Sequence, residues 1–230
     1  MRAQRFPVML FAAGFGTRMG ALTAHQPKPL IRVAGKPLID HALDLVRGHG
    51  AERIVANLHY LPEPLERHLA ETGVILSHES PEILETGGGL RHALPLLGSG
   101  PVMTMNTDAV WAGPNPLDHI AALWNPEQMD ALLLCIPKPQ AIGHMGKGDF
   151  VIDGDLRAVR GPGAIYSGLQ IIRTDLLHDI PKASFSLNLL WDKMLATGRL
   201  YATPYPGTWC DVGRPEGIKL AEAMLGWPDV

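Results

Sequence analysis

The first 136 residues alternate between short apolar runs and stretches in which apolar residues recur at helical spacing. Residues 8–12 are continuously apolar and are followed closely by glycine, which is the pattern of a buried strand. Similar runs predict strands at 54–56, 74–76, 101–106 and 131–136. Helical spacing predicts helices that begin at Pro37 and that cover 63–71, 90–97 and 116–124. This alternation indicates a mainly parallel sheet with helices on both faces.

From residue 149 the pattern changes to short strands, predicted at 150–152 and 165–172, and then to helices near 186–197 and 215–225. The sequence contains no internal repeat, low-complexity tract or linker. It therefore predicts one α/β domain over residues 1–230, a Rossmann-like three-layer sandwich with a mixed, mainly parallel sheet. Ligands of such sheets bind beyond the carboxyl ends of the strands, which directs attention to residues 13–30, 77–89 and 106–111.

The composition narrows the class of partner. Of the 230 residues, 46% are hydrophobic, which is enough for a sizeable core. The formal charge of −3 gives no basic surplus, so we expect no nucleic-acid partner, although backbone amides and a few cations could hold a small anion. The apolar run at 8–13 is too short for a signal sequence, and no run approaches the roughly 18 residues of a membrane span. We therefore expect a cytoplasmic protein without a membrane partner.

A glycine loop, Ala13-Gly14-Phe15-Gly16-Thr17-Arg18-Met19, follows the first predicted strand directly. Glycines at this point allow backbone N–H groups to approach a phosphate. The dinucleotide fingerprint would need glycine in place of Met19, and a P-loop sequence occurs nowhere in the chain, so a nicotinamide-dependent oxidoreductase is not supported. Farther along, Pro27 and Pro29 hold Lys28 in an extended segment, from which its ammonium group could be aimed at a phosphate.

Together with Leu22-Thr23 and Pro27-Lys28-Pro29-Leu30, this loop resembles the signature of the sugar-phosphate nucleotidyltransferases. The resemblance extends over roughly residues 8–217 and implies the fold of nucleotide-diphospho-sugar transferases, with a nucleotide-binding half at about 1–112 and a sugar-binding half at about 113–230. It implies that Arg18 and Lys28 stabilise charge while a sugar 1-phosphate attacks the α-phosphorus of the nucleotide and pyrophosphate leaves. The residues that it implies for the nucleotide phosphates are Ala13, Gly14, Gly16 and Thr17.

Two aspartates stand where strands are expected to end. Asp108 follows Asn106-Thr107, and Asp211 lies within Trp209-Cys210-Asp211-Val212-Gly213. Carboxylates at the ligand end of a strand can hold a Mg²⁺ ion that bridges phosphates. The resemblance implies that Asp108 and Asp211 are the metal ligands and that Mg²⁺ is the cofactor.

The segment Glu85-Thr86-Gly87-Gly88-Gly89 precedes a predicted helix. Three glycines in a row would make a backbone surface on which a flat base or a ribose could lie. We therefore place Glu85, Gly87 and Gly88 in the nucleotide site. This form of the segment resembles the bacterial N-acetylmuramate 1-phosphate uridylyltransferases of cell-wall recycling, and this favours UTP as the nucleotide.

Two further segments resemble that subgroup on the sugar side, Gly146-Lys147-Gly148-Asp149-Phe150 and Tyr166-Ser167-Gly168. The sugar contacts that this implies are Gly148, Asp149, Ser167 and Gly168. The chain departs from the family at Gly20-Ala21, where relatives usually have Arg-Pro, and at Thr107, which replaces a frequent glycine. Neither departure removes a charged group that the reaction needs.

The sequence thus predicts Mg²⁺-dependent nucleotidyl transfer to a sugar 1-phosphate, with UTP and N-acetylmuramate 1-phosphate as the favoured pair. Mannose 1-phosphate guanylyltransferase and glucose 1-phosphate thymidylyltransferase stay open, because base choice depends on hydrogen-bond geometry that a sequence does not expose. The alternative from another class is a non-catalytic sensor of nucleotide sugars. The set of Arg18, Lys28, Asp108 and Asp211 argues against a sensor, which would be free to lose them. The oligomeric state and the number of metal ions also stay open.

Overall fold

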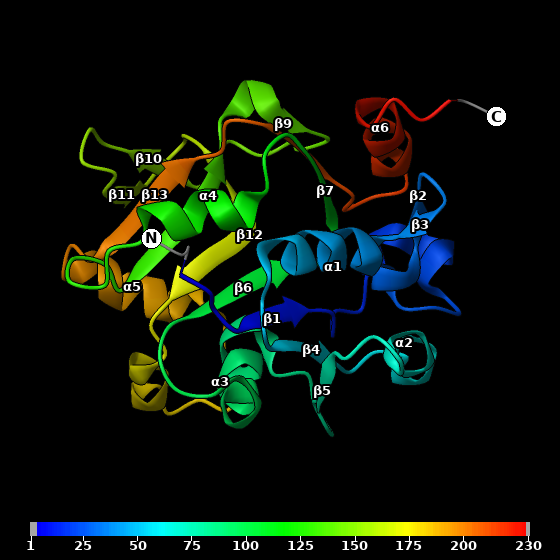
Figure 1. The fold of residues 1–230 in the computed structure, drawn as a ribbon, viewed down its shortest axis with the longest axis horizontal. Coiled ribbons are helices and arrows are strands. Elements are labelled where there is room, and N and C mark those ends of the chain that lie inside the picture. The colour runs from blue at the N-terminus through cyan, green and yellow to red at the C-terminus, as the bar shows by residue number, and fades with distance from the viewer. Residues whose placement is uncertain (1–3, 229–230) are drawn as a thin grey trace.

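A computed structural model describes residues 4–228 and contains a central seven-stranded sheet between two layers of helices (Figure 1). The strand order across the sheet is β13, β8, β12, β6, β1, β4, β5. Their bounds are Val8–Phe11 (β1), Ile54–Leu58 (β4), Ile75–His78 (β5), Val102–Asn106 (β6), Ala131–Ile136 (β8), Ile165–Ile172 (β12) and Leu200–Pro204 (β13). Only β12 runs antiparallel to its neighbours in this sheet. The predicted fold class is confirmed.

The alternation of side chains along β1 explains the two helical layers. Val8 and Leu10 share a hydrophobic cluster with residues of α1 (Leu38–His49), α2 (Pro62–Leu69) and α4 (Pro116–Leu123). Met9 belongs to a second cluster, with residues of α3 (Glu85–Leu97) and α5 (Asn188–Ala196). Both faces of the strand are therefore covered, which is why its sequence is continuously apolar. A further helix, α6 (Glu216–Met224), lies beside the β2–β3 hairpin (Arg32–Val33 and Lys36–Pro37) (Figure 1).

A small second sheet brings the late part of the chain to the central sheet. Its strand order is β7 (Ala109–Ala112), β14 (Thr208–Asp211), β9 (Ala141–Ile142). β14 pairs antiparallel with β7, and the register places Asp211 opposite Ala109. The N–H of Val212 then donates a hydrogen bond of 2.9 Å to the carbonyl of Asp108. Because only two residues separate β7 from β6, this pairing places Asp211 close to the end of β6.

The observed bounds differ from the predicted ones in two informative places. The strands expected at 131–136 and 165–172 occur with those bounds, whereas the helix expected at 90–97 already begins at Glu85. The glycine triplet therefore lies inside the first turns of α3 and not before it. β13 and the hairpin strand β11 (Ala158–Arg160), which pairs with β10 (Phe150–Ile152), were not predicted. No helix in residues 4–228 is both long and apolar enough to cross a membrane.

Candidate active site

The glycine loop and Asp108 follow strands that end at the same edge of the central sheet. Phe11, the last residue of β1, is the register partner of Asn106, the last residue of β6. Because these strands are parallel, the segments that follow them begin side by side at the carboxyl edge. They border a cavity of about 280 Å³. Eight of the predicted site residues line it: Ala13, Gly14, Gly16, Thr17, Arg18, Lys28, Glu85 and Asp108.

The two glycines of the loop meet different requirements. Gly16 has a φ of 63°, and a Cβ atom there would lie 2.9 Å from Thr23 Cγ2 and 3.0 Å from Lys28 Cβ. A Cβ atom on Gly14, by contrast, would meet no heavy atom within 4 Å. Gly16 therefore lets the loop turn closely against the lysine segment. Gly14 leaves open space in the wall of the cavity, which a phosphate could approach.

Lys28 is a buried cation that reaches the acidic part of the cavity. It begins the 3₁₀ helix η2 (Lys28–Leu30), and Pro27 and Pro29 restrict the backbone on either side. Only 9% of the residue is exposed, and its Nζ donates a hydrogen bond of 2.8 Å to Asp108 Oδ2. This ion pair compensates for the water that the ammonium group has lost. It also holds the cation at the carboxyl edge of the sheet, where a ligand phosphate would need it.

Asp211 does not line the cavity itself but lies next to this ion pair. Burial raises the pKa of Asp211, and the nearby carboxylate of Asp108 raises it further, whereas Lys28, Arg18 and His144 lower it. The cluster therefore contains two carboxylates that repel each other in a partly dehydrated place. His144 is a member of this environment that the sequence did not indicate.

The two aspartates fit a magnesium ion that is shared with phosphates. Mg²⁺ usually binds one or two carboxylates and fills its remaining positions with water and phosphate oxygens. No group of three or more histidine, cysteine or acidic residues able to hold a metal ion occurs in residues 4–228. The described residues therefore do not form a site in which protein groups alone supply the metal ligands. A divalent cation between Asp108 and Asp211 would relieve the repulsion that raises the pKa of Asp211.

The glycine triplet has a packing role that differs from the predicted one. Gly87 and Gly88 are buried, do not line the cavity, and donate hydrogen bonds of 2.8 and 3.0 Å to the carbonyl of Phe185. A Cβ atom on Gly87 would overlap the Phe185 ring, and one on Gly88 would overlap the carbonyl of Ala183. Gly87 and Gly88 thus let the 183–185 segment pass close to α3, whereas a Cβ atom on Gly89 would overlap Glu79 Oε1. Only the start of this motif faces the cavity, where Glu85 adopts a left-handed φ of 59°.

A buried polar network that was not predicted joins three parts of the cavity wall. Asn57 Oδ1 accepts a hydrogen bond of 2.8 Å from the N–H of Ala12, and Asn57 Nδ2 donates one of 2.6 Å to Glu79 Oε1. Glu79 Oε2 accepts a bond of 2.7 Å from the N–H of Leu84. The network ties the end of β1 to the start of α3 and so holds these parts of the cavity wall in place. The available signal was a polar residue directly after a predicted apolar strand.

A second cavity of about 280 Å³ adjoins the first and shares Phe11, Thr86 and Asn106 with it. Of the four predicted sugar contacts, only Asp149 lines this cavity. Its carboxylate accepts a hydrogen bond of 2.8 Å from the N–H of Tyr166. Tyr166, from the predicted sugar-side segment, also lines the wall, as do Arg160 and Trp191, which the sequence did not indicate.

The remaining predicted sugar contacts do not line this cavity. Ser167 is buried, and its hydroxyl donates a hydrogen bond of 2.7 Å to the carbonyl of Leu134. Gly168 has a φ of 88°, and a Cβ atom there would lie 2.7 Å from Asn106 Cβ. Gly148 has a φ of 93°, and a Cβ atom there would overlap the carbonyl of Gly163. Gly148 therefore allows the backbone at Gly163 to approach closely, and Gly168 allows the Asn106 side chain to pack against it.

Comparison with known proteins places the chain in a family. A family model described as a MobA-like NTP transferase domain matches residues 8–160. The chain belongs to this family. The structure is also similar to that of the inositol-1-phosphate CTP transferase from T. maritima, with a TM-score of 0.79 over 100% of both chains and 15% sequence identity. That similarity supports the fold.

Two relatives with the same name are similar to this chain over nearly its whole length. The N-acetylmuramate alpha-1-phosphate uridylyltransferase of Caulobacter vibrioides is 39% identical over 94% of this chain and 96% of its own. The protein of that name from Neisseria meningitidis serogroup B is 34% identical over 95% of this chain and 97% of its own. The prediction that the chain is a sugar-1-phosphate nucleotidyltransferase is confirmed.

Proposed function

We propose that the enzyme transfers a uridylyl group from UTP to N-acetylmuramate 1-phosphate and releases pyrophosphate, with Mg²⁺ as cofactor. The observation that carries the chemistry is the cluster of Lys28, Asp108 and Asp211 at the end of the glycine-loop cavity. The choice of substrates is supported by the two relatives, because their similarity extends over both halves of the chain. We further propose that the reaction takes place in the cytoplasm and belongs to cell-wall recycling.

The reaction depends on positioning and charge neutralisation. An ionised oxygen of the sugar phosphate attacks the α-phosphorus of UTP, and the bond from that phosphorus to the bridging oxygen breaks. Pyrophosphate then leaves with the bonding electron pair. Because the attacking oxygen is already ionised, no general base is needed, and catalysis comes from orientation and from charges aimed at the phosphates.

Each charged residue of the site has a proposed part in that reaction. Lys28 would bind the α-phosphate and offset the charge that grows on it, and Arg18 would hold the β- and γ-phosphates. Asp108 and Asp211 would hold Mg²⁺, which neutralises phosphate charge when it is bound. The backbone of the glycine loop would follow the phosphates, because Gly14 leaves the wall of the cavity open there. Glu85 would lie on the base side and Asp149 on the sugar side.

The proposal is tested by measuring pyrophosphate release over a grid of four nucleoside triphosphates (UTP, GTP, CTP and dTTP) and four sugar 1-phosphates. The sugars are N-acetylmuramate, N-acetylglucosamine, mannose and glucose 1-phosphate, each with Mg²⁺ and with chelator. We expect the highest kcat/KM for UTP with N-acetylmuramate 1-phosphate, loss of turnover in chelator and recovery on adding Mg²⁺. A maximum for GTP with mannose 1-phosphate, or for dTTP with glucose 1-phosphate, would replace the proposed reaction by one of its alternatives. Nucleotide-sugar binding without any turnover would identify a sensor.

A further inference from the structure

The second cavity contains a cation that the proposed reaction has not used. Arg160 ends strand β11, and among the described residues that line this cavity it is the only lysine or arginine. The same cavity shares Asn106 with the nucleotide cavity, so it opens toward the phosphates. It is therefore the place where the sugar of a sugar 1-phosphate would lie.

Two nitrogens of the Arg160 guanidinium group are hydrogen-bonded, and the third bonds none of the described residues. Its Nε and Nη2 donate hydrogen bonds of 3.1 and 2.7 Å to Asp192 Oδ1, and Nη2 also donates one of 3.0 Å to Asn188 Oδ1. The guanidinium carbon lies 5.6 Å from the centroid of the buried Phe150 ring. Its Nη1 makes no hydrogen bond to any residue between 4 and 228. Helix α5 thus orients the guanidinium group and leaves one nitrogen, with two N–H groups, for a ligand.

No described residue that lines the cavity bonds that nitrogen, although the guanidinium group as a whole is ion-paired with Asp192. Asp149 is the only acidic residue among the described lining residues, and its Oδ2 already accepts the N–H of Tyr166 at 2.8 Å. Asp192, which orients Arg160 from α5, does not line this cavity. The rings of Tyr166 and Trp191 pack edge to face, with centroids 4.8 Å apart, and form a firm wall. The cavity therefore offers one directed cation beside aromatic surface, an arrangement that favours an anionic group on the sugar.

We propose that Arg160 selects sugar 1-phosphates that carry a carboxylate, which it binds through its free Nη1. This inference rests on the proposed function, in which the substrate is N-acetylmuramate 1-phosphate. That sugar has a lactyl carboxylate in addition to its phosphate, whereas N-acetylglucosamine 1-phosphate is the same molecule without the lactyl group. Lys28 and Asp108 are in the first cavity with the reacting phosphates, so the two anionic ends of the substrate have separate cationic partners. Without the carboxylate, Arg160 would have no ligand partner in the complex.

The test compares these two sugars, with UTP as the common nucleotide, in the wild-type enzyme and in two variants. Arg160→Gln should lower kcat/KM for N-acetylmuramate 1-phosphate by about 10–100-fold and change that for N-acetylglucosamine 1-phosphate by less than about threefold. Arg157→Gln is the matched control. Arg157 belongs to the same hairpin, contacts the Tyr201 ring at 5.4 Å and the carbonyl of Gly198 at 2.6 Å, and does not line the second cavity. We expect this control to leave both sugars unchanged.

Three outcomes would overturn the inference, and they differ in what else they overturn. Equal losses for both sugars in Arg160→Gln would mean that Arg160 acts on the shared phosphate or on the fold. Unchanged kinetics for both sugars would mean that it does not contact substrate, and in these two cases the proposed function stands. If the wild-type enzyme turns over neither sugar, the proposed function fails and the inference fails with it. Melting temperatures of the variants check that a selective loss is not caused by unfolding.

Discussion

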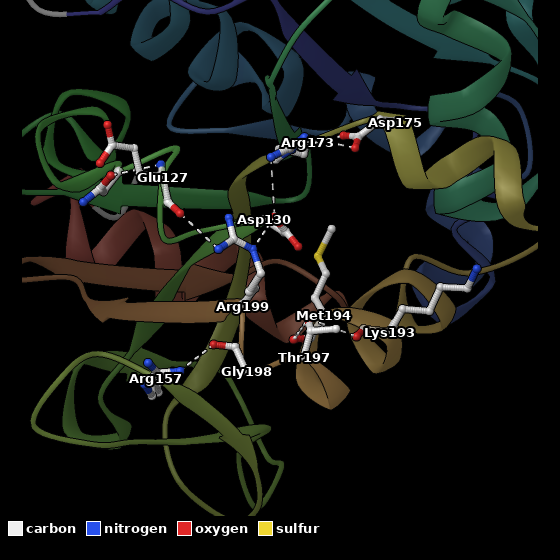
Figure 2. A network of polar contacts seen from close by, with 11 residues as sticks. Glu127, Asp130, Arg157, Arg173, Asp175, Lys193, Met194, Thr197, Gly198 and Arg199 are labelled. Carbon is white, nitrogen blue, oxygen red and sulfur yellow. Dashed lines mark hydrogen bonds and ion pairs between the residues drawn. The ribbon is translucent and has the colours of Figure 1, made fainter.

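Two charged clusters lie at opposite edges of the central sheet. At the edge away from the glycine loop, Asp130 precedes β8, Arg199 precedes β13 and Arg173 follows the antiparallel β12. Figure 2 shows Asp130 between the two arginines, with Arg199 Nε 2.8 Å and Arg173 Nη1 3.8 Å from Asp130 Oδ1. The side chain of Asp130 is 13% exposed. Asp175 forms an ion pair with the same Arg173, with Nη2 3.1 Å from Asp175 Oδ2, so two carboxylates and two arginines are paired in this half-buried cluster.

The cluster at the ligand edge is not fully ion-paired within the described residues. The negative charges of Asp108 and Asp211 repel each other. In residues 4–228 only one cation forms an ion pair with either carboxylate, namely Lys28, whose Nζ lies 2.8 Å from Asp108 Oδ2. Burial and the charge of Asp108 raise the pKa of Asp211 despite this lysine. The charged residues are therefore arranged differently in the two clusters. In the Asp130 cluster each carboxylate is ion-paired and the pairs join three strand ends, whereas only one of the two carboxylates in the Asp108–Asp211 cluster is ion-paired within residues 4–228.

The largest expected effect is on catalysis, and it should occur in one cluster only. Asp108→Asn and Asp211→Asn should each lower kcat/KM by about 10²–10³-fold, because each removes a charge that is proposed to hold Mg²⁺ against the phosphates. Asp130→Asn should change kcat/KM by less than about threefold, since it lies at the other edge of the sheet. Pyrophosphate release at saturating Mg²⁺ measures all three variants. Full turnover in Asp108→Asn and Asp211→Asn would remove the metal assignment.

The second expected effect is a pH dependence that reports the like-charge pair. Because the pKa of Asp211 is raised, protonation should remove a metal ligand at a higher pH than for an ordinary aspartate. Below that pKa, kcat/KM should fall about tenfold for each pH unit. Higher Mg²⁺ concentration should move this acid limb to lower pH, because metal ions and protons compete for the carboxylate. An acid limb at the ordinary aspartate pKa that does not respond to Mg²⁺ would contradict this explanation.

The smallest expected effect is on stability, and it should have opposite signs in the two clusters. Asp130→Asn removes the carboxylate of Arg199, whereas Arg173 keeps its ion pair with Asp175, and should cost about 1–2 kcal/mol, a value reduced because Arg199 is partly exposed. In a chain of this size that corresponds to a Tm lower by about 2–8 °C. Calorimetry without Mg²⁺ measures it.

In the same experiment Asp211→Asn should raise Tm at neutral pH. A carboxyl group whose pKa is raised by folding makes the folded state less stable above that pKa, and the cost disappears as the pH falls toward the unfolded value of 3.8. The gain should therefore shrink in acid, and Mg²⁺ should favour the wild-type protein instead. A lower Tm for Asp211→Asn at every pH would show that this aspartate stabilises the fold, as Asp130 does.

Much of the central sheet could be predicted because its signal is local. Strands such as 131–136 are buried on both faces and are therefore apolar at every position, so their bounds are visible in the chain itself. The start of α3 was missed because glycine normally weakens a helix, and here the close approach of the 183–185 segment requires it. The start of the helix therefore depends on packing against residues that are distant in sequence. For the same reason β13 and β11, which end in proline and arginine, gave no clear local signal.

The residues of the site also fall into those that a local sequence pattern predicts and those that only the fold brings together. The sequence by itself determined the glycine loop with Arg18 and the proline-bounded Lys28, because their residue types and order lie in one short stretch, residues 13–30. Only the tertiary structure decided that Asp211 meets Asp108, that Ser167 donates to a strand carbonyl, and that Arg160 turns toward a cavity. These outcomes depend on strand register and on which face a side chain takes. Register is set by pairing between distant segments, and a shift of one residue would reverse every face.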